Sequence, residues 1–261
     1  MVRSIFLPRL QPIELVKPFF IIILALIISN KKISNFTTKF IFSFLLTCLI
    51  VLFLLLQQDL GQTLLIAFSW AITIFVSGIN LFFFISISVI GIILLLFISF
   101  YFPKFEYIKN RLISFFDTQT GTHNFQSDKA IESITSGGFF GKGIGEGILK
   151  NRVPEAHTDY IISVISEEFG VIAIMLILIL FLVFIFSVLK KVNFESNHRV
   201  KLILIGSSSL ILLQAMIHIG VNIRLFPTTG MTLPFLSYGG SSIISVSILS
   251  GIILNLTKRK V

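Results

Sequence analysis

Residues 160–189 read YIISVISEEFGVIAIMLILILFLVFIFSVL, and this long apolar stretch decides the fold class. A helix that crosses a hydrocarbon core about 30 Å thick needs roughly 20 mainly apolar residues, and this stretch exceeds that length. Its only charged residues are Glu167 and Glu168. The stretch therefore predicts a transmembrane helix that carries two acidic side chains.

Six more apolar stretches of similar length occur along the chain, at 15–30, 40–56, 62–79, 80–102, 202–222 and 235–256. Apolar residues make up 55% of the 261 residues, charged residues make up 13%, and the mean hydropathy is +0.98. A soluble domain of this length needs far more polar surface to cover one core. We therefore predict a single all-α membrane domain over residues 1–261, a bundle of about seven transmembrane helices. The single cysteine, Cys48, is expected to be a buried and unreactive thiol.

The distribution of charge predicts the orientation of this bundle. One set of connections, with the C-terminus, contains a single acid, Glu195, and these basic residues: Lys31, Lys32, Lys39, Lys190, Lys191, Arg199, Lys201, Lys258, Arg259 and Lys260. By the positive-inside rule this set is cytoplasmic, which places the segment 103–159 outside. Seven spans with a cytoplasmic C-terminus put Arg3 and Arg9 on the outer side. The simplest explanation is that an odd number of preceding helices is missing or encoded elsewhere.

The outer segment 103–159 is the longest connection between predicted spans. Connections beyond about 12–15 residues are usually functional in compact folds. This one contains residues 137–147, GGFFGKGIGEG, where glycines permit close backbone approach to a ligand. The pattern matches neither a P-loop nor a dinucleotide fingerprint, and a flexible re-entrant or surface turn is the competing interpretation. Both interpretations stay open from the sequence.

A second feature of the outer segment is Pro154-Glu155-Ala156-His157-Thr158-Asp159, which runs directly into the helix predicted from Tyr160. Thr158 or Asp159 is of the type that caps a helix N-terminus. The functional alternative is that Asp159 is a base at the membrane boundary. Glu167 and Glu168 are expected about two turns deeper, on faces roughly 100° apart, so at most one shares a face with Asp159. Acids inside a membrane span usually have a function, and the alternative is that one of them only braces a neighbouring helix.

Two further outer boundaries carry acids, at Asp59 and at Glu14 with Lys17. Asp59 is also a common turn residue, and Glu14 and Lys17, three residues apart, are able simply to pair with each other. Together with Arg111 of the outer segment, these residues suggest a cleft that holds a divalent cation and a diphosphate.

Taken in order, these segments resemble the SEDS family of bacterial shape, elongation, division and sporulation proteins. The motifs that carry the resemblance are Gln11-Pro12-x-Glu14-x-x-Lys17, Asp59-Leu60-Gly61, Arg111 with Phe115 and Asp117, Gln126, Gly137-Gly138-x-x-Gly141-x-Gly143, Pro154-Glu155-Ala156-His157-Thr158-Asp159, Glu167-Glu168-x-Gly170, Pro227-Thr228-Thr229-Gly230 and Leu233-Pro234-Phe235-Leu236-Ser237-Tyr238-Gly239-Gly240-Ser241-Ser242. The chain departs from the family pattern at Ile13, Gln58, Lys129 and His218. The resemblance implies a ten-span glycosyltransferase that polymerises lipid II into peptidoglycan, with closest similarity to the division branch. Only the last seven spans have counterparts here, so we expect that three N-terminal helices are absent.

The resemblance also implies roles for individual residues. Asp159 is the expected catalytic base of an inverting transfer, and Asp59 with Asp159 is the expected site of Mg²⁺ or Mn²⁺. Residues expected to bind substrate or diphosphate are Lys17, Arg111, Gln126, Glu14, His157 and Ser241. Residues expected to support the site are Glu167, Glu168, Gly137 and Gly138.

The implied partners are lipid II, a class B penicillin-binding transpeptidase and other division proteins, with no nucleic acid. The implied location is the bacterial plasma membrane at the division septum. Two alternatives remain open from the sequence. The chain is either a transporter that flips lipid II, which also accounts for Glu167, Glu168 and Gln214, or a truncated, non-catalytic division scaffold.

Overall fold

The computed structural model describes residues 11–33, 35–78, 85–86, 89–91, 93, 97, 99–116 and 122–258. Within these ranges every regular element is helical. The α-helices are α1 (Pro12–Ile28), α2 (Phe36–Leu56), α3 (Leu60–Val76), α5 (Glu106–Phe116), α6 (Thr122–Gly137), α7 (Ile161–Phe194), α8 (His198–Asn222) and α9 (Gly240–Thr257). Two short 3-10 helices are η1 (Pro103–Phe105) and η2 (Leu149–Arg152). The all-α class predicted from the sequence is confirmed.

Six of the predicted apolar stretches correspond to helices. Four of these, α2, α7, α8 and α9, are long and apolar enough to cross a membrane, while α1 and α3 have 17 residues each. The remaining predicted span, 80–102, lies mostly outside the described residues, as do the motif residue Asp117 and the terminal residues Arg3, Arg9, Arg259 and Lys260. The chain is therefore a multi-pass membrane protein.

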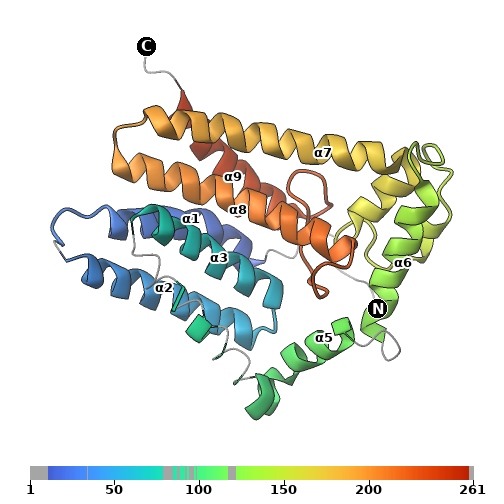
Figure 1. Cartoon of the computed structure of the whole chain (residues 1–261), viewed down its shortest axis with the longest axis horizontal. Helices are drawn as coiled ribbons and strands as arrows, with labels where there is room; N and C mark the ends of the chain where they lie inside the picture. Colours follow the sequence, from blue (N-terminus) through green and yellow to red (C-terminus); the bar gives the residue numbers. More distant parts are fainter. Residues whose placement is uncertain are drawn as a thin grey trace, which may run out of the picture.

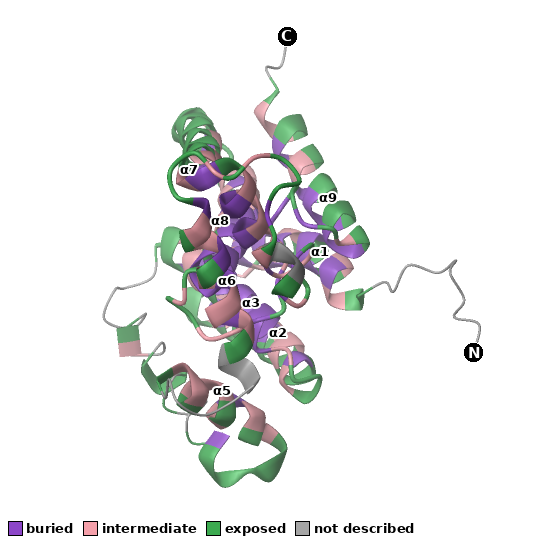
Figure 2. Ribbon diagram, turned by 90° about the vertical axis from the view of Figure 1, so that its right-hand side faces the viewer, coloured by how far each residue is buried: buried purple, intermediate pink, exposed green. Residues whose placement is uncertain are grey.

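Helix α8 forms the centre of the bundle (Figures 1 and 2). It packs against α1, α3, α7 and α9. Of its most apolar 18-residue stretch, 67% is buried, whereas the corresponding share is 22% in α2 and in α7. Small residues permit this packing, because a Cβ on Gly206 would lie 2.8 Å from Ile21 Cγ2 of α1. Close approach at small residues is the usual way in which membrane helices associate.

The two ends of the bundle are tied together by different contacts. At one end, Arg199 Nε donates to Ser29 Oγ at 3.1 Å, which joins the start of α8 to the end of α1. At the other end, Asn222 Nδ2 donates to the backbone oxygen of Asp159 at 3.1 Å, which joins the end of α8 to the start of α7. The first is the end predicted to be cytoplasmic, and the second is the end predicted to be outer.

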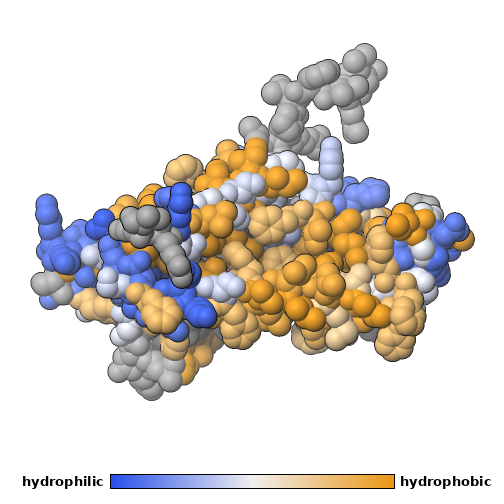
Figure 3. Space-filling view, turned by 90° about the horizontal axis from the view of Figure 1, so that it is seen from above, coloured by the Kyte–Doolittle hydropathy of each residue, from blue (hydrophilic) through white to orange (hydrophobic). Residues whose placement is uncertain are grey.

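Between these ends the surface is apolar. Figure 3 shows a broad hydrophobic belt with hydrophilic regions on both sides of it. Cys48 lies on this exterior, because its side chain is exposed on α2 and not buried in the bundle. The prediction of a buried thiol was wrong, since an apolar sequence run does not distinguish a lipid-facing position from a core position.

The outer segment 103–159 is largely folded rather than extended. It contains η1, α5, α6 and η2, and α6 packs along α7. Helix α7 is itself broken at Gly170, whose backbone angles are φ 77° and ψ 178°. Its first part lies at a steep angle to the long remaining rod (Figure 1).

Candidate active site

Asp159 sits in a tight turn just before α7. The amides of Thr158, Asp159 and Tyr160 all donate to the backbone oxygen of Glu155, at 3.1, 3.0 and 3.3 Å. Tyr160 is the residue that caps α7, and no side chain caps this helix end. The capping interpretation of Thr158 and Asp159 was therefore wrong, and the carboxylate of Asp159 is not used to satisfy the helix.

The carboxylate of Asp159 faces the connection 223–239 between α8 and α9. A Cβ on Gly230 would lie 3.4 Å from Asp159 Oδ2, so Gly230 packs directly beside the carboxylate. The pKa of Asp159 is raised to about 6, mainly by burial and also by the negative charges of Glu155 and Asp59. A carboxylate with this pKa is an effective proton acceptor near neutral pH.

Asp59 lies at the start of α3 and does cap that helix. Its Oδ1 accepts from the Gln62 amide at 3.0 Å, so the structural role of Asp59 is that of a helix cap directly after the turn at residues 57–58. Burial raises the pKa of Asp59, and the charges of Lys17 and Arg111 act in the opposite direction. Gly61 lies two residues further along the chain, and a Cβ there would lie 2.9 Å from Thr229 Cβ. The start of α3 therefore packs tightly against the connection 223–239.

Arg111 reaches the same connection from α5. Its Nη1 donates to the Thr228 backbone oxygen at 3.3 Å, and its guanidinium lies 5.9 Å from the centre of the Tyr107 ring. The Tyr107 hydroxyl donates to the Leu55 backbone oxygen at 3.3 Å, which attaches α5 to the end of α2. Arg111 also exerts its charge on Asp59 and Tyr160. The structure thus brings Asp159, Asp59 and Arg111 around one connection.

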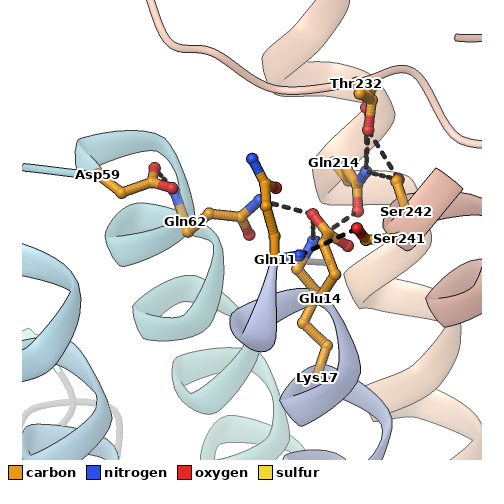
Figure 4. A network of polar contacts seen from close by, with 9 residues as sticks. All are labelled: Gln11, Glu14, Lys17, Asp59, Gln62, Gln214, Thr232, Ser241 and Ser242. Atoms are coloured by element: carbon orange, nitrogen blue, oxygen red, sulfur yellow. Dashed lines mark hydrogen bonds and ion pairs between the residues drawn. The ribbon is translucent and has the colours of Figure 1, made fainter. Parts of the chain in front are cut away.

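Glu14 and Lys17 form the buried pair that the sequence allowed, but they do so inside a larger network (Figure 4). Lys17 Nζ donates to Glu14 Oε1 at 2.7 Å and to Gln214 Oε1 at 3.2 Å, and Gln62 Nε2 donates to Glu14 Oε1 at 2.8 Å. The side chains of Lys17 and Glu14 are 0% and 2% exposed. The network continues from Gln214 Nε2 to the Thr232 backbone oxygen at 3.0 Å. It ties α1, α3 and α8 to the connection that faces Asp159.

The remaining predicted substrate residues are less closely grouped. Ser241 lies at the start of α9, and its Oγ accepts from the Gln11 amide at 3.0 Å. His157 is exposed, and its backbone oxygen accepts from the Tyr238 amide at 2.9 Å. Gln126 is half-buried on α6. The structure places Ser241 next to the buried network, while His157 and Gln126 lie on the outer segment.

The glycine-rich segment 137–147 packs against α7. The break at Gly170 leaves backbone groups of α7 without partners inside the helix. The backbone oxygens of Glu167 and Glu168 therefore accept from the Lys142 and Gly143 amides, at 2.9 and 3.0 Å. A Cβ on Gly137 or Gly141 would overlap the backbone of α7. The segment forms turns with exposed residues, which agrees with the interpretation as a surface turn. Two of its glycines, Gly137 and Gly141, serve close packing against the helix.

The carboxylates of Glu167 and Glu168 also bind this segment. Glu167 is fully buried, and its Oε1 accepts from the Ile148 and Leu149 amides at 3.0 Å each. Its Oε2 accepts from Ser133 Oγ of α6 at 3.0 Å. Glu168 Oε1 accepts from the Gly145 amide at 3.2 Å. These acids fasten the outer segment to the first part of α7, and both precede the break at Gly170, so they lie about two turns along the helix from Asp159 as predicted.

Comparison with known proteins identifies the family. The sequence model of the family described as Cell cycle protein, which covers FtsW, RodA and SpoVE, matches residues 4–261. The chain belongs to the SEDS family.

Named relatives agree with this assignment. The SEDS chain is 34% identical over 252 residues to a probable peptidoglycan glycosyltransferase FtsW of Caulobacter vibrioides, a match that covers 96% of this chain and 63% of the relative. It is 32% identical over 257 residues to the FtsW of the same description from Geobacter sulfurreducens, with coverage of 95% and 67%. The chain thus spans about two thirds of the length of these relatives.

Solved structures show the same fold. The rod shape determining protein RodA of Thermus thermophilus matches with a TM-score of 0.61 and 27% identity, over 95% of this chain and 64% of RodA. A chain of a peptidoglycan synthase complex, solved to describe the coordination of polymerization and crosslinking, matches with a TM-score of 0.77 and 24% identity. This match covers 95% of the present protein and 69% of the chain in the complex.

The carboxylates of the SEDS site suit a hard divalent cation whose remaining ligands would come from the substrate and water. In the part of the chain that the structure describes, no three His, Cys, Asp or Glu side chains gather as a metal site. Mg²⁺ is often held by one or two carboxylates together with substrate phosphates and water. Asp59 and Asp159 supply two such carboxylates, and the negative charge of Asp59 contributes to the raised pKa of Asp159. A cation between them fits because it would compensate this repulsion.

Several residues of the site were given no individual role from the sequence. Asn222 fixes the Asp159 backbone, and Ser237 Oγ donates to the Thr158 oxygen at 2.6 Å. Arg224 Nη1 pairs with Asp128 Oδ1 at 2.7 Å, which links the connection 223–239 to α6. A polar residue at the end of an apolar stretch was the only available signal for Asn222. The pairing of Arg224 with Asp128 has no local sequence signal, because the two residues are far apart in the chain.

Proposed function

We propose that this SEDS protein is an inverting peptidoglycan glycosyltransferase that polymerises lipid II. The observation that carries the proposal is the Asp159 carboxylate, which is half-buried, unused by its own helix, and has a pKa raised to about 6. Membership of a family whose named relatives include probable peptidoglycan glycosyltransferases supports it. The reaction joins the sugar of one lipid-linked precursor to the sugar of another.

In the proposed step, Asp159 accepts the proton of the acceptor sugar hydroxyl while that oxygen attacks the anomeric carbon of the donor. The new glycosidic bond forms as the bond between the anomeric carbon and the diphosphate oxygen breaks, and the lipid diphosphate leaves with the electron pair. A single displacement of this kind inverts the anomeric centre. A positioned base contributes roughly 10²–10⁴-fold to such a reaction, because a sugar hydroxyl is a poor nucleophile. Asp159 later releases its proton to water.

Positive charge is needed where the diphosphate departs. The positive charge of Arg111 acts to lower the pKa of Asp59, which burial raises, and Arg111 Nη1 donates to the Thr228 backbone oxygen at 3.3 Å. Asp59 and Asp159 would hold Mg²⁺ or Mn²⁺, which when bound would stabilise the negative charge of the diphosphate. Lys17, which is 0% exposed and paired with Glu14 at 2.7 Å, holds together the helices behind these groups. Gln126, His157 and Ser241 are proposed to contact the bound substrates.

The membrane arrangement follows from the same proposal. By the positive-inside rule, the C-terminus lies in the cytoplasm and the outer segment 103–159 lies at the outer face of the plasma membrane. Asp159 then lies where polyprenyl-linked substrates are held. The family assignment supports a role at the division septum with a class B penicillin-binding transpeptidase as partner.

The transporter alternative is less favoured by the contacts of the acidic residues. Glu167 accepts from two loop amides and from Ser133, Glu168 accepts from Gly145, and Gln214 is engaged by Lys17 and Thr232. These groups are therefore occupied in joining structural elements, and a pathway for a lipid headgroup needs polar groups that exchange partners with it.

The proposal is tested by incubating the purified chain in proteoliposomes with labelled lipid II, with and without Mg²⁺. We expect glycan strands from the wild type and a loss of roughly 10²-fold or more with Asp159→Asn. Glu155→Gln is the matched control, because it removes the same charge from an exposed neighbouring residue. Translocation of lipid II without polymerisation would favour the transporter. The absence of both polymerisation and translocation, together with rescue of a division-defective strain by Asp159→Asn, would favour the scaffold.

A further inference from the structure

A cluster of large apolar side chains projects from the outer segment. Phe139, Phe140, Ile144 and Ile148 are 74%, 84%, 78% and 68% exposed, and we call these four residues the apolar rim. Apolar side chains exposed together usually mark a surface that contacts another molecule or a membrane. The catalytic proposal gives the apolar rim no role.

Backbone contacts fix the position of the apolar rim relative to α7. The amides of Val171 and Ile172 donate to the Gly138 and Phe139 oxygens at 3.0 and 3.4 Å. Phe139 is therefore attached at the break in α7, where the long rod of that helix begins. The apolar rim cannot move far from this level unless those bonds break.

The length of α7 gives the depth of this level in the membrane. Lys190 and Lys191 lie near the end of α7 that was predicted to be cytoplasmic. From Gly170 to Lys190 is 20 residues, which at 1.5 Å per residue is about 30 Å of helix. This equals the thickness of a typical hydrocarbon core, about 30 Å. If the lysines mark the cytoplasmic edge of the hydrocarbon, the break at Gly170 and the attached Phe139 lie at its outer edge.

The lipid-facing surface of α7 leads directly to the apolar rim. Ile172, Met175, Leu176 and Ile179 are 48%, 58%, 58% and 56% exposed along the rod. Ile172 at the top of this surface is bonded to Phe139. The apolar rim is therefore attached at the end of the exposed apolar face of the rod.

We propose that the apolar rim inserts into the outer leaflet of the bilayer. Aromatic side chains are favoured at the membrane–water interface, which is the level of Phe139 and Phe140. Lys142, which lies between the aromatic and aliphatic members in the sequence, is paired through its Nζ with the buried Glu167 Oε1 at 3.5 Å, so this cation holds the segment against α7. The outer segment is then held on two sides, by Glu167 inside and by lipid outside. This inference does not depend on the reaction that the protein catalyses.

Tryptophan fluorescence tests the insertion. Phe140→Trp in a Trp70→Phe background, in the full chain reconstituted into phosphatidylcholine–phosphatidylglycerol vesicles, makes residue 140 the only emitter, because Trp70 is the chain's single tryptophan. We expect emission at shorter wavelength than in water, with loss of intensity in vesicles whose lipids carry bromine near the headgroup end of the acyl chain. Circular dichroism and size-exclusion chromatography check that the variant folds.

Glu132→Trp in the same background is the matched control, since Glu132 is half-exposed on α6 and has a charged, water-facing side chain. Its emission should be water-like and insensitive to brominated lipid. The inference is overturned if residue 140 behaves like residue 132. Water-like emission in vesicles that shifts only on addition of a transpeptidase would also overturn it, and would assign the apolar rim to a protein partner.

Discussion

Two groups of charged residues lie at the same end of this molecule and are built in opposite ways. Lys17 and Glu14 are sealed in the bundle, joined to each other at 2.7 Å and to Gln62 and Gln214. Asp159 and Asp59 are partly open, and the negative charge of Asp59 helps to raise the pKa of Asp159. The first arrangement fixes helices, whereas the second keeps a carboxylate reactive. The difference indicates that rigidity at this end comes from the paired charges and chemistry from the repelling ones.

Removing one partner of the sealed pair should have the largest effect on stability. Lys17→Met leaves Glu14 buried without its cation, and we expect a loss of about 3–5 kcal/mol of unfolding free energy. Lys129→Met is the control, since the Lys129–Glu132 pair at 2.6 Å has 24% and 51% exposed side chains. An exposed pair is worth about 0–1 kcal/mol. Denaturant unfolding in detergent measures both variants, and equal losses would show that the buried network does not carry the rigidity.

Disturbing the packing of the glycine-rich segment against α7 should have the next largest effect on stability. Gly141 has φ 78° and a Cβ there would overlap the Glu168 backbone, so we expect Gly141→Ala to cost about 2–4 kcal/mol. Gly145 has φ 83° with open space around it, so Gly145→Ala should cost only about 1–2 kcal/mol. Thermal unfolding separates the two variants. A smaller loss at Gly141 than at Gly145 would contradict the described packing.

Breaking the ion pair between α6 and the connection facing Asp159 should have a smaller effect on stability. Asp128→Asn removes the ion pair with Arg224, at 2.7 Å and partly exposed, so we expect a stability loss of about 0–1 kcal/mol. Because the pair positions the connection beside Asp159, KM for lipid II should rise while kcat changes little. Glu132→Gln, which breaks the exposed pair on the same helix, should change neither constant.

The smallest expected effect is on the pH dependence of the open site. Glu155 is the leading like charge that raises the pKa of Asp159, so Glu155→Gln should move the acid limb of activity to lower pH. Above the pKa of about 6 the variant and the wild type should react at equal rates. An acid limb that stays in place would show that Glu155 does not act on the base.

The raised pKa of Asp159 also has a consequence for stability. The folded state binds the Asp159 proton more tightly than the unfolded state, so this group favours folding at low pH and that contribution is lost as the pH rises from 3.8 through about 6. Asp159→Asn should therefore be more stable than the wild type at neutral pH, although inactive. Thermal unfolding at neutral pH and near pH 3, where the difference should vanish, checks this sign.

The sequence predicted the spans and the residues of the site better than it predicted their contacts. Apolar stretches are local, so the helices could be predicted, and ordered motifs identified Asp159, Asp59 and Arg111. Whether Cys48 faces lipid or core depends on neighbours that are distant in the chain. The break at Gly170 has the same origin, because a glycine within an apolar run is compatible with both a straight and a broken helix. The partners of Glu167 could not be predicted, since they depend on where the glycine-rich segment folds back.

The most direct test of the central claim is the pH dependence of lipid II polymerisation by the wild type under single-turnover conditions. If Asp159 is the base, the rate should fall about tenfold per pH unit below about 6, because only the ionised carboxylate accepts the proton. Asp159→Asn should be slower by roughly 10²-fold or more and should lack this limb. A wild-type rate that is constant through this range, or an Asp159→Asn variant with the wild-type profile, would contradict the assignment of Asp159 as the catalytic base.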